Sequence, residues 1–85
     1  MAMTKIKFCG LRREEDVKYA ALLGADFMGF ILSVRFKRFV PPEEVRRFKD
    51  FVPSNAKTVG VFVDENEQYV IGAAKESKLD MIQLH

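Results

Sequence analysis

The sequence predicts an α/β fold built on a parallel β-sheet. Short apolar segments of strand length alternate with segments of helical periodicity, in the order β-α-β-α-β-α-β, along all 85 residues. Such alternation implies right-handed crossovers and parallel strands. A weak repeat supports it, because Ala20-Ala21 leads into Asp26-Phe-Met-Gly-Phe and Ala73-Ala74 leads, one residue later, into Asp80-Met-Ile-Gln-Leu. No linker or low-complexity stretch interrupts the pattern, so residues 1–85 are expected to form one unit of βα repeats.

Near Gly10 the spacing of apolar residues changes from every second residue to helical spacing. This change predicts a first strand followed by a first helix. Ile6 and Phe8 alternate with lysines up to this glycine, which is the pattern of a strand that runs into a turn. Helical spacing then begins, and we expect a helix over residues 13–23. Acidic residues occupy its first turn, Gly24 is placed as its cap, and four apolar residues are expected to face the core: Val17, Ala20, Ala21 and Leu22.

The second strand is the nearly continuous apolar run Asp26–Leu32, which is typical of a strand covered on both faces. A second helix opens at Pro41-Pro42-Glu43-Glu44, where proline costs no hydrogen bond and the acids suit the helix dipole. Pro53 ends it. Val45, Phe48 and Phe51 are predicted to form its buried stripe.

The third strand is Lys57–Val63, which is rich in β-branched residues. Asp64 or Asn66 can cap the helix that follows, which is predicted to end near Lys78. Its apolar face would contain Val70, Ile71, Ala73 and Ala74, and a fourth strand is expected over Leu79–Leu84. Two architectures satisfy this order of elements: half of an eight-stranded TIM (βα)₈ barrel, or a small open flavodoxin-like sheet with helices on both faces.

Composition and charge exclude several classes of protein. Fourteen Lys and Arg against twelve Asp and Glu leave a formal net charge of +2, too small for a nucleic-acid-binding surface. The longest apolar stretch is far shorter than the roughly 18 residues of a membrane span, so we expect no membrane partner. Charged residues recur from Lys5 to Asp16 and leave no room for a secretory signal. With one cysteine, the chain is expected to be cytoplasmic and Cys9 to be a free thiol.

Candidate functional residues lie where the predicted strands end, because ligands of parallel α/β folds bind at the carboxyl ends of the strands. Cys9 ends the first strand, and a thiolate there could accept a proton. The alternative is that Cys9 is a small buried apolar residue.

Two further groups of polar residues follow the predicted strands. Arg35, Lys37 and Arg38 form a basic cluster that could hold a carboxylate or phosphate, or could simply be a solvated loop. His85, the only histidine, ends the fourth strand and could donate a hydrogen bond, or could be frayed. The sequence has no metal-ligand cluster and no glycine-rich phosphate loop, so we expect no metal and no cofactor.

Five motifs in this order resemble the phosphoribosylanthranilate isomerase family over the whole length of the sequence. They are Lys7-Phe8-Cys9-Gly10-Leu11, Gly24-Ala25-Asp26-Phe27-Met28-Gly29-Phe30, Lys37-Arg38-Phe39-Val40, Val59-Gly60-Val61-Phe62-Val63 and Gln83-Leu84-His85. The resemblance implies the N-terminal half of a (βα)₈ barrel. The family performs an Amadori rearrangement of N-(5′-phosphoribosyl)anthranilate in tryptophan biosynthesis, without cofactor or metal.

The resemblance also implies residue roles. Cys9 matches the general base that removes the sugar C2 proton, Arg38 matches an arginine that holds the anthranilate end of the substrate, and Gln83 and His85 match polar residues that line the pocket. The family's general acid is an aspartate on strand five, and its phosphate-binding loops follow strands seven and eight. Arg12-Arg13 and Phe36 depart from the small polar residues that the family usually has.

These implications leave two functional expectations. The first is an isomerase half-site that has little or no turnover by itself, because the general acid and phosphate loops are missing. The second is a non-catalytic structural or engineered half-barrel, which self-associates as a homo-oligomer or pairs with a complementary half, because the edges of its first and fourth strands are unpaired.

Overall fold

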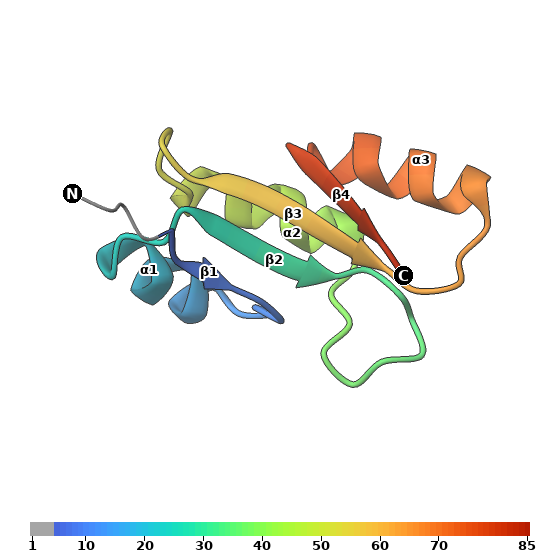
Figure 1. The fold of residues 1–85 in the computed structure, drawn as a ribbon, viewed down its shortest axis with the longest axis horizontal. Coiled ribbons are helices and arrows are strands. Elements are labelled where there is room, and N and C mark those ends of the chain that lie inside the picture. The colour runs from blue at the N-terminus through green and yellow to red at the C-terminus, as the bar shows by residue number, and fades with distance from the viewer. Residues whose placement is uncertain (1–4) are drawn as a thin grey trace.

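A computed structural model describes residues 5–85 and shows a four-stranded sheet whose strands are all parallel (Figure 1). The strands lie in the sheet in the same order as in the chain, so each crossover moves one position in the same direction. The strands are β1 (Lys7–Phe8), β2 (Phe27–Ile31), β3 (Lys57–Phe62) and β4 (Met81–Leu84).

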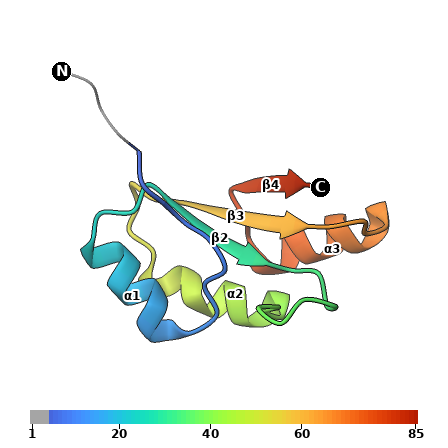
Figure 2. The ribbon, with the colours of Figure 1, turned by 60° about the horizontal axis from the view of Figure 1, so that its bottom comes forward.

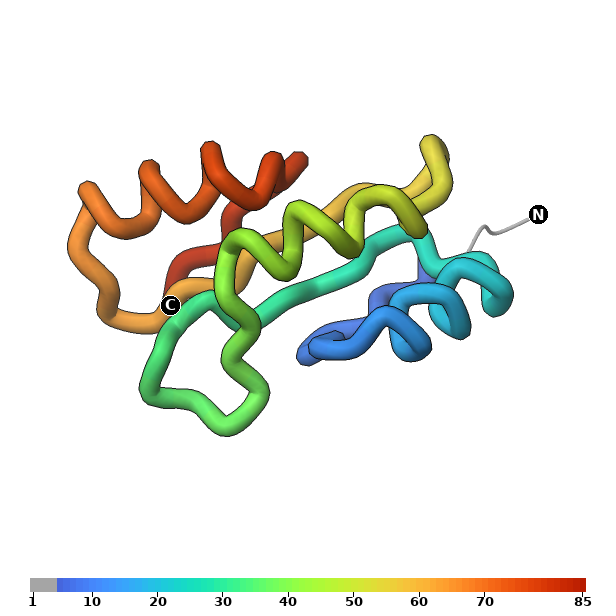
Figure 3. Tube along the Cα trace, turned by 180° about the vertical axis from the view of Figure 1, so that it is seen from behind, coloured from blue at the N-terminus to red at the C-terminus, as the bar shows by residue number. Residues whose placement is uncertain are grey.

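All three α-helices cover one face of this sheet, as Figures 2 and 3 show from two directions. Right-handed crossovers that always step the same way place their helices on the same side. The flavodoxin-like alternative is therefore wrong, because it requires helices on both faces, and the arrangement is that of half a (βα)₈ barrel. The helices are α1 (Glu14–Leu22), α2 (Pro42–Phe48), which continues into the 3₁₀ turn η1 (Lys49–Phe51), and α3 (Glu67–Ser77).

Most observed ends of the elements agree with the sequence prediction to within two residues. The exception is α2, which ends at Phe48 and continues as a 3₁₀ turn to Phe51, ahead of the expected stop at Pro53. Of the two candidate caps of α3, Asn66 is the one used, since its side-chain oxygen accepts a hydrogen bond from Tyr69 N at 2.8 Å. β4 begins at Met81 rather than Leu79. The reason is local: Leu79 packs against the core, and the carboxylate of Asp80 bonds to the neighbouring strand instead.

The hydrophobic core fills the space between the helices and the sheet. The rings of Phe30 on β2 and Phe48 on α2 stack with their centroids 6.1 Å apart, and both side chains are almost fully buried. Each buried side chain of this size contributes about 2–3 kcal/mol of hydrophobic stabilisation. The other large residues that are buried in this layer are Val17, Met28, Leu32, Val45 and Phe62.

Two apolar residues that the sequence placed on the core face lie outside it. Leu22 is 84% exposed and Ile71 is 46% exposed. Leu22 is five residues beyond the buried Val17, which turns it about 140° away from the core on a helix of 3.6 residues per turn. Ile71 follows Val70 directly and is turned by about 100°. The stripe on α1 is therefore narrower than predicted.

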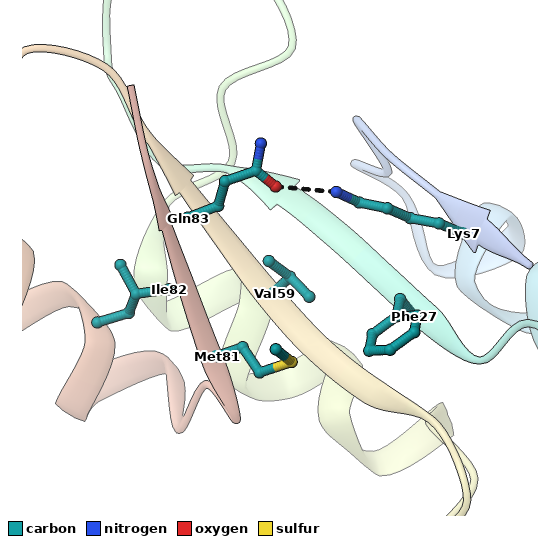
Figure 4. Close-up of a pocket in the computed structure, with 6 residues that line it drawn as sticks. All are labelled: Lys7, Phe27, Val59, Met81, Ile82 and Gln83. Carbon is teal, nitrogen blue, oxygen red and sulfur yellow. Dashed lines mark hydrogen bonds between the residues drawn. The ribbon is translucent and has the colours of Figure 1, made fainter. Parts of the chain in front are cut away.

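The other face of the sheet carries no helix in the described part of the chain. Side chains alternate along a strand, and the register Gly29↔Val59↔Met81 and Ile31↔Val61↔Gln83 places these residues on one side in layers. This open face holds a hollow of about 370 Å³, shown in Figure 4 and lined by Lys7, Phe27, Val59, Met81, Ile82 and Gln83. Among residues 5–85, no helix has the length and apolar character needed to cross a membrane.

A polar cluster joins the amino-terminal ends of β3 and β4. The Oδ2 atom of Asp80 accepts hydrogen bonds from Thr58 N at 2.8 Å and Thr58 Oγ1 at 3.0 Å, and Lys49 Nζ lies 3.4 Å away. Burial alone would raise the pKa of Asp80. The hydrogen bonds from Thr58 and the charge of Lys49 outweigh it and hold that pKa below its ordinary value.

We expect Asp80→Asn to lower the free energy of unfolding at neutral pH by about 1 kcal/mol, since a neutral acceptor replaces a partly exposed carboxylate. Because the folded-state pKa is depressed, the carboxylate's contribution is present above the ordinary value near 4 and is lost as pH falls through the folded value. Urea unfolding at pH 7 and pH 3 tests this. The difference between the two proteins should be smaller at pH 3 than at pH 7, and the exposed control Asp50→Asn should change neither value. An Asp80→Asn deficit that is as large at pH 3 as at pH 7 would contradict the assignment.

Candidate functional site

The candidate site lies on the open face, at the carboxyl ends of the strands. The polar residues that the sequence singled out come from two places: the turn after β1 together with the long β2–α2 loop, and the end of β4. The structure places Arg38 against Gly10, the residue after Cys9, and brings Gln83 and His85 together as a pair.

Cys9 follows β1 directly and is an exposed free thiol. It is therefore not the small buried residue of the alternative interpretation. The turn is fixed because Gly10 N and Leu11 N both donate to Gly29 O, at 3.0 and 3.1 Å. Gly29 on β2 also leaves room for the thiol, since a Cβ atom built there would lie 3.2 Å from Cys9 Sγ.

Arg38 lies against the turn that carries Cys9. A Cβ atom at Gly10 would lie 3.1 Å from Arg38 Cδ and 3.2 Å from its Nη1 atom, so the guanidinium approaches the backbone directly. Gly10 also has a φ of +79°, a conformation that costs glycine little and other residues more. One glycine thus permits both the turn after the thiol and the arginine packed beside it.

The rest of the predicted basic cluster is directed elsewhere. Arg35 Nη2 donates to Val63 O at 3.2 Å and to Asp64 Oδ2 at 3.3 Å, which ties the loop to the end of β3. Arg12 Nη1 donates to Lys37 O at 3.3 Å. These residues shape the loop, and Arg38 is the member that lies against Gly10, next to Cys9 in the chain.

Tyr69 on α3 secures the end of β2 from the helix side. Its hydroxyl donates to Leu32 O at 2.6 Å, and its ring packs edge-on against Phe62 with centroids 6.0 Å apart. Burial, together with the charges of Glu65 and Glu43, raises the pKa of Tyr69, so it remains a donor across the neutral range. Ser33, also buried, accepts from Val63 N at 2.9 Å and joins the ends of β2 and β3.

Gln83 and His85 form the second pair, on alternate positions of the last strand. The amide nitrogen of Gln83 lies 2.7 Å from His85 Nε2. The backbone of His85 is held by the sheet, because its N donates to Phe62 O at 2.9 Å and its O accepts from Asp64 N at 3.1 Å. In this structure the alternative of a frayed end is therefore wrong.

Lys7 is a further candidate residue, which the sequence pattern did not single out. Its ammonium donates to Gln83 Oε1 at 2.9 Å, across the open face from β1 to β4, and the two side chains point toward one another in Figure 4. This bond joins side chains of the two edge strands of the sheet. Side chains alternate between the two faces of a strand, so Lys7, two residues before Cys9, shares its face. This alternation is the sequence signal that could have identified Lys7.

The side chains of the site suit proton transfer and anion binding. A thiol can exchange a proton, a guanidinium binds carboxylate or phosphate, and an amide and an imidazole can donate or accept hydrogen bonds. Within residues 5–85, no group of three or more His, Cys, Asp or Glu side chains is placed to hold a metal ion.

Comparison with known proteins identifies the family. The model of the family "N-(5'phosphoribosyl)anthranilate (PRA) isomerase" matches residues 6–85. The N-(5'-phosphoribosyl)anthranilate isomerase of Bacillus velezensis is 44% identical over 85 residues, which are 100% of this chain and 39% of that protein.

Two solved structures agree with this match. The phosphoribosyl anthranilate isomerase of Thermotoga maritima superposes with a TM-score of 0.92 at 35% identity, over 98% of this chain and 40% of that one. A phosphoribosyl anthranilate isomerase in complex with reduced 1-(o-carboxyphenylamino)-1-deoxyribulose 5-phosphate gives a TM-score of 0.91 at 35% identity, over 98% of this chain and 43% of that one. The chain thus spans less than half the length of these relatives, and it belongs to the N-(5′-phosphoribosyl)anthranilate isomerase family.

Proposed function

We propose that this chain forms the half of a phosphoribosylanthranilate isomerase active site that carries the general base. The observation that supports this most directly is the exposed thiol of Cys9 at the carboxyl end of β1, with the guanidinium of Arg38 packed against the next residue. A proton acceptor and an anion-binding group therefore lie side by side on the face where ligands of parallel α/β folds bind. The reaction would be the Amadori rearrangement of N-(5′-phosphoribosyl)anthranilate, a step of tryptophan biosynthesis.

Cys9 would act at the carbon beside the imine. Protonation of the ring oxygen opens the furanose and leaves a protonated imine between C1 and the anthranilate nitrogen. The thiolate then takes the proton from C2. The C–H electron pair forms a C1=C2 double bond, and the electrons of the C=N bond return to nitrogen. A weak base suffices because the adjacent positive charge acidifies this C–H bond. The enolamine that results becomes the ketone when C1 gains a proton and the C2 hydroxyl loses one.

Arg38, Gln83 and His85 would bind the substrate. The ligand of the solved relative described above has a carboxyphenyl group and a 5-phosphate. A guanidinium pairs with a carboxylate through two parallel hydrogen bonds, so Arg38 suits the anthranilate carboxylate. Gln83 and His85, at the end of β4, would contact hydroxyl groups of the opened sugar.

The other half of the reaction requires groups outside this chain. In the family, the general acid and the phosphate-binding loops belong to strands five, seven and eight, whereas residues 5–85 form four strands. We therefore propose that the 85-residue chain alone has little or no turnover. Loss of a general acid alone typically lowers the rate by about 10²–10⁴-fold, and loss of phosphate binding removes substrate positioning as well.

The role of Cys9 is best tested in a chimera in which residues 6–85 replace the matching part of the Bacillus velezensis relative. We expect Cys9→Ala to lower kcat by about 10²–10⁴-fold with little change in KM, because it removes the base without removing a binding group. The decay of anthranilate-substrate fluorescence measures the rate. Retention of kcat within a few-fold would rule out Cys9 as the base.

The unfused chain, assayed beside the chimera, should show little or no turnover. A rate near that of the full enzyme would refute its proposed inactivity.

The role of Arg38 predicts a different kinetic pattern. Arg38→Ala in the same chimera should lower kcat/KM by about 10–100-fold, mainly through KM, since a charge-assisted contact with the substrate is lost. Arg46→Ala is the matched control because Arg46 is an exposed arginine of α2, away from the strand ends. If both variants lose activity equally, or if neither does, Arg38 does not bind the anthranilate end.

A second candidate function is that of a non-catalytic half-barrel that assembles with another chain. The observation that favours it is the apolar surface of β4, where Met81, Ile82 and Leu84 are 47%, 46% and 68% exposed. Such surfaces mark protein contacts. The outer edges of β1 and β4 also leave backbone groups without strand partners in the described part of the chain, and unpaired edges favour pairing with another strand. A second copy, or a complementary half, would cover both features.

For this candidate we expect analytical ultracentrifugation at micromolar concentration to show a species heavier than the monomer. Leu84→Asp should shift it toward the monomer, since a charge at the edge strand opposes burial. The control is Val34→Asp, which changes a residue of similar exposure, 66%, in the β2–α2 loop. A strictly monomeric wild-type chain, or equal effects of the two substitutions, would argue against assembly through β4.

A further inference from the structure

An unbroken series of hydrogen bonds crosses the open face from β1 to the end of β4. Lys7 Nζ lies 2.9 Å from Gln83 Oε1, and Gln83 Nε2 lies 2.7 Å from His85 Nε2 (Figure 4 shows the first contact). The middle side chain is an amide, which has one end that only accepts and one end that only donates hydrogen bonds. Its orientation therefore determines what each neighbour must do.

The orientation of the Gln83 amide is set by Lys7. An ammonium group can only donate, so the amide end that faces it must be the oxygen. The NH₂ end of Gln83 then faces His85, and the histidine nitrogen at 2.7 Å must accept a hydrogen bond. An imidazole nitrogen accepts only when it carries no proton. In the neutral ring, the proton therefore lies on Nδ1.

We propose that Lys7, acting through Gln83, holds His85 in the tautomer that is protonated on Nδ1. This is the reverse of the preference of a neutral histidine in water, where the proton is found mainly on Nε2. Lys7 is thus a positioning residue: it defines which nitrogen of His85 donates and which accepts. The tautomer follows from the hydrogen bonds alone, while its use rests on the proposed function, in which the Nδ1–H group would donate to an oxygen of the substrate.

The consequence of removing Lys7 follows from the same geometry. Without the ammonium, the amide of Gln83 can rotate about its last bond and present either end to His85, so the preference for Nδ1–H weakens. Replacing the amide by a carboxylate has the opposite effect. Both oxygens of a glutamate at position 83 accept, so one can bond to Lys7 while the other requires a proton on His85 Nε2.

Nitrogen NMR of the imidazole tests the proposal directly, since His85 is the only histidine of the chain and needs no assignment. Long-range ¹H–¹⁵N correlations are recorded on the ¹⁵N-labelled 85-residue chain at alkaline pH, where imidazole is neutral. We expect a pyrrole-type shift for Nδ1 and a pyridine-type shift for Nε2. The reverse pattern in the wild-type chain, with Nε2 protonated, would overturn the proposal outright.

Three variants separate Lys7 from other influences on the ring. Gln83→Glu should place the proton on Nε2, and Lys7→Met should lower the ratio of Nδ1–H to Nε2–H severalfold. Lys57→Met, the same change at another exposed strand lysine, should leave the wild-type ratio intact. An unchanged ratio in Lys7→Met, with an amide spectrum that shows the same fold, would exclude Lys7 as the cause. Because no substrate is used, these outcomes are independent of whether Cys9 and Arg38 serve the isomerase reaction.

Discussion

The constraint on which the rest of the structure depends is that every crossover steps in the same direction. It places α1, α2 and α3 on one face of the sheet and concentrates the large buried side chains there. The other face is then free to carry polar groups, and the alternation of side chains brings Lys7, Cys9 and Gln83 to it. A doubly wound sheet with the same strands would bury that face under a helix and leave these residues no access to a ligand.

Most elements of the fold could be predicted because their signals are local. Apolar periodicity, acidic first turns and glycine or proline at the ends identified the helices and strands to within two residues, except at the end of α2. Local patterns could not choose between a half-barrel and an open sheet, since the choice depends on whether each new strand joins the same edge of the sheet. The family resemblance predicted the half-barrel, and the structure confirms it. Leu22 shows a smaller limit of the same kind: it is apolar and near the core stripe, yet it points away from the core.

The sequence predicted where the candidate site lies in the fold better than it predicted which side chains contact one another there. Cys9, Arg38, Gln83 and His85 are candidates because strand ends, and the loops that follow them, are where parallel α/β folds bind ligands. Grouping Arg35 with Arg38 by sequence proximity was misleading, since Arg35 binds Asp64 and the end of β3 while Arg38 turns back to Gly10. Lys7 was missed because a lysine in a strand is usually a solvated residue, and its partner lies 76 positions away in the chain.

The relative energies of the two faces explain how the site can be polar without unfolding the sheet. An exposed pair such as Lys7 and Gln83 contributes at most about 1 kcal/mol, whereas Phe30, Phe48 and Phe62 contribute about 2–3 kcal/mol each through burial. Burial between the helices and the sheet therefore dominates the stability, and the bond from Lys7 on β1 to Gln83 on β4 adds little to it. The polar groups of the open face are thereby free to orient one another rather than to stabilise the fold. Their substitution should alter the chemistry of the site while leaving the core unchanged.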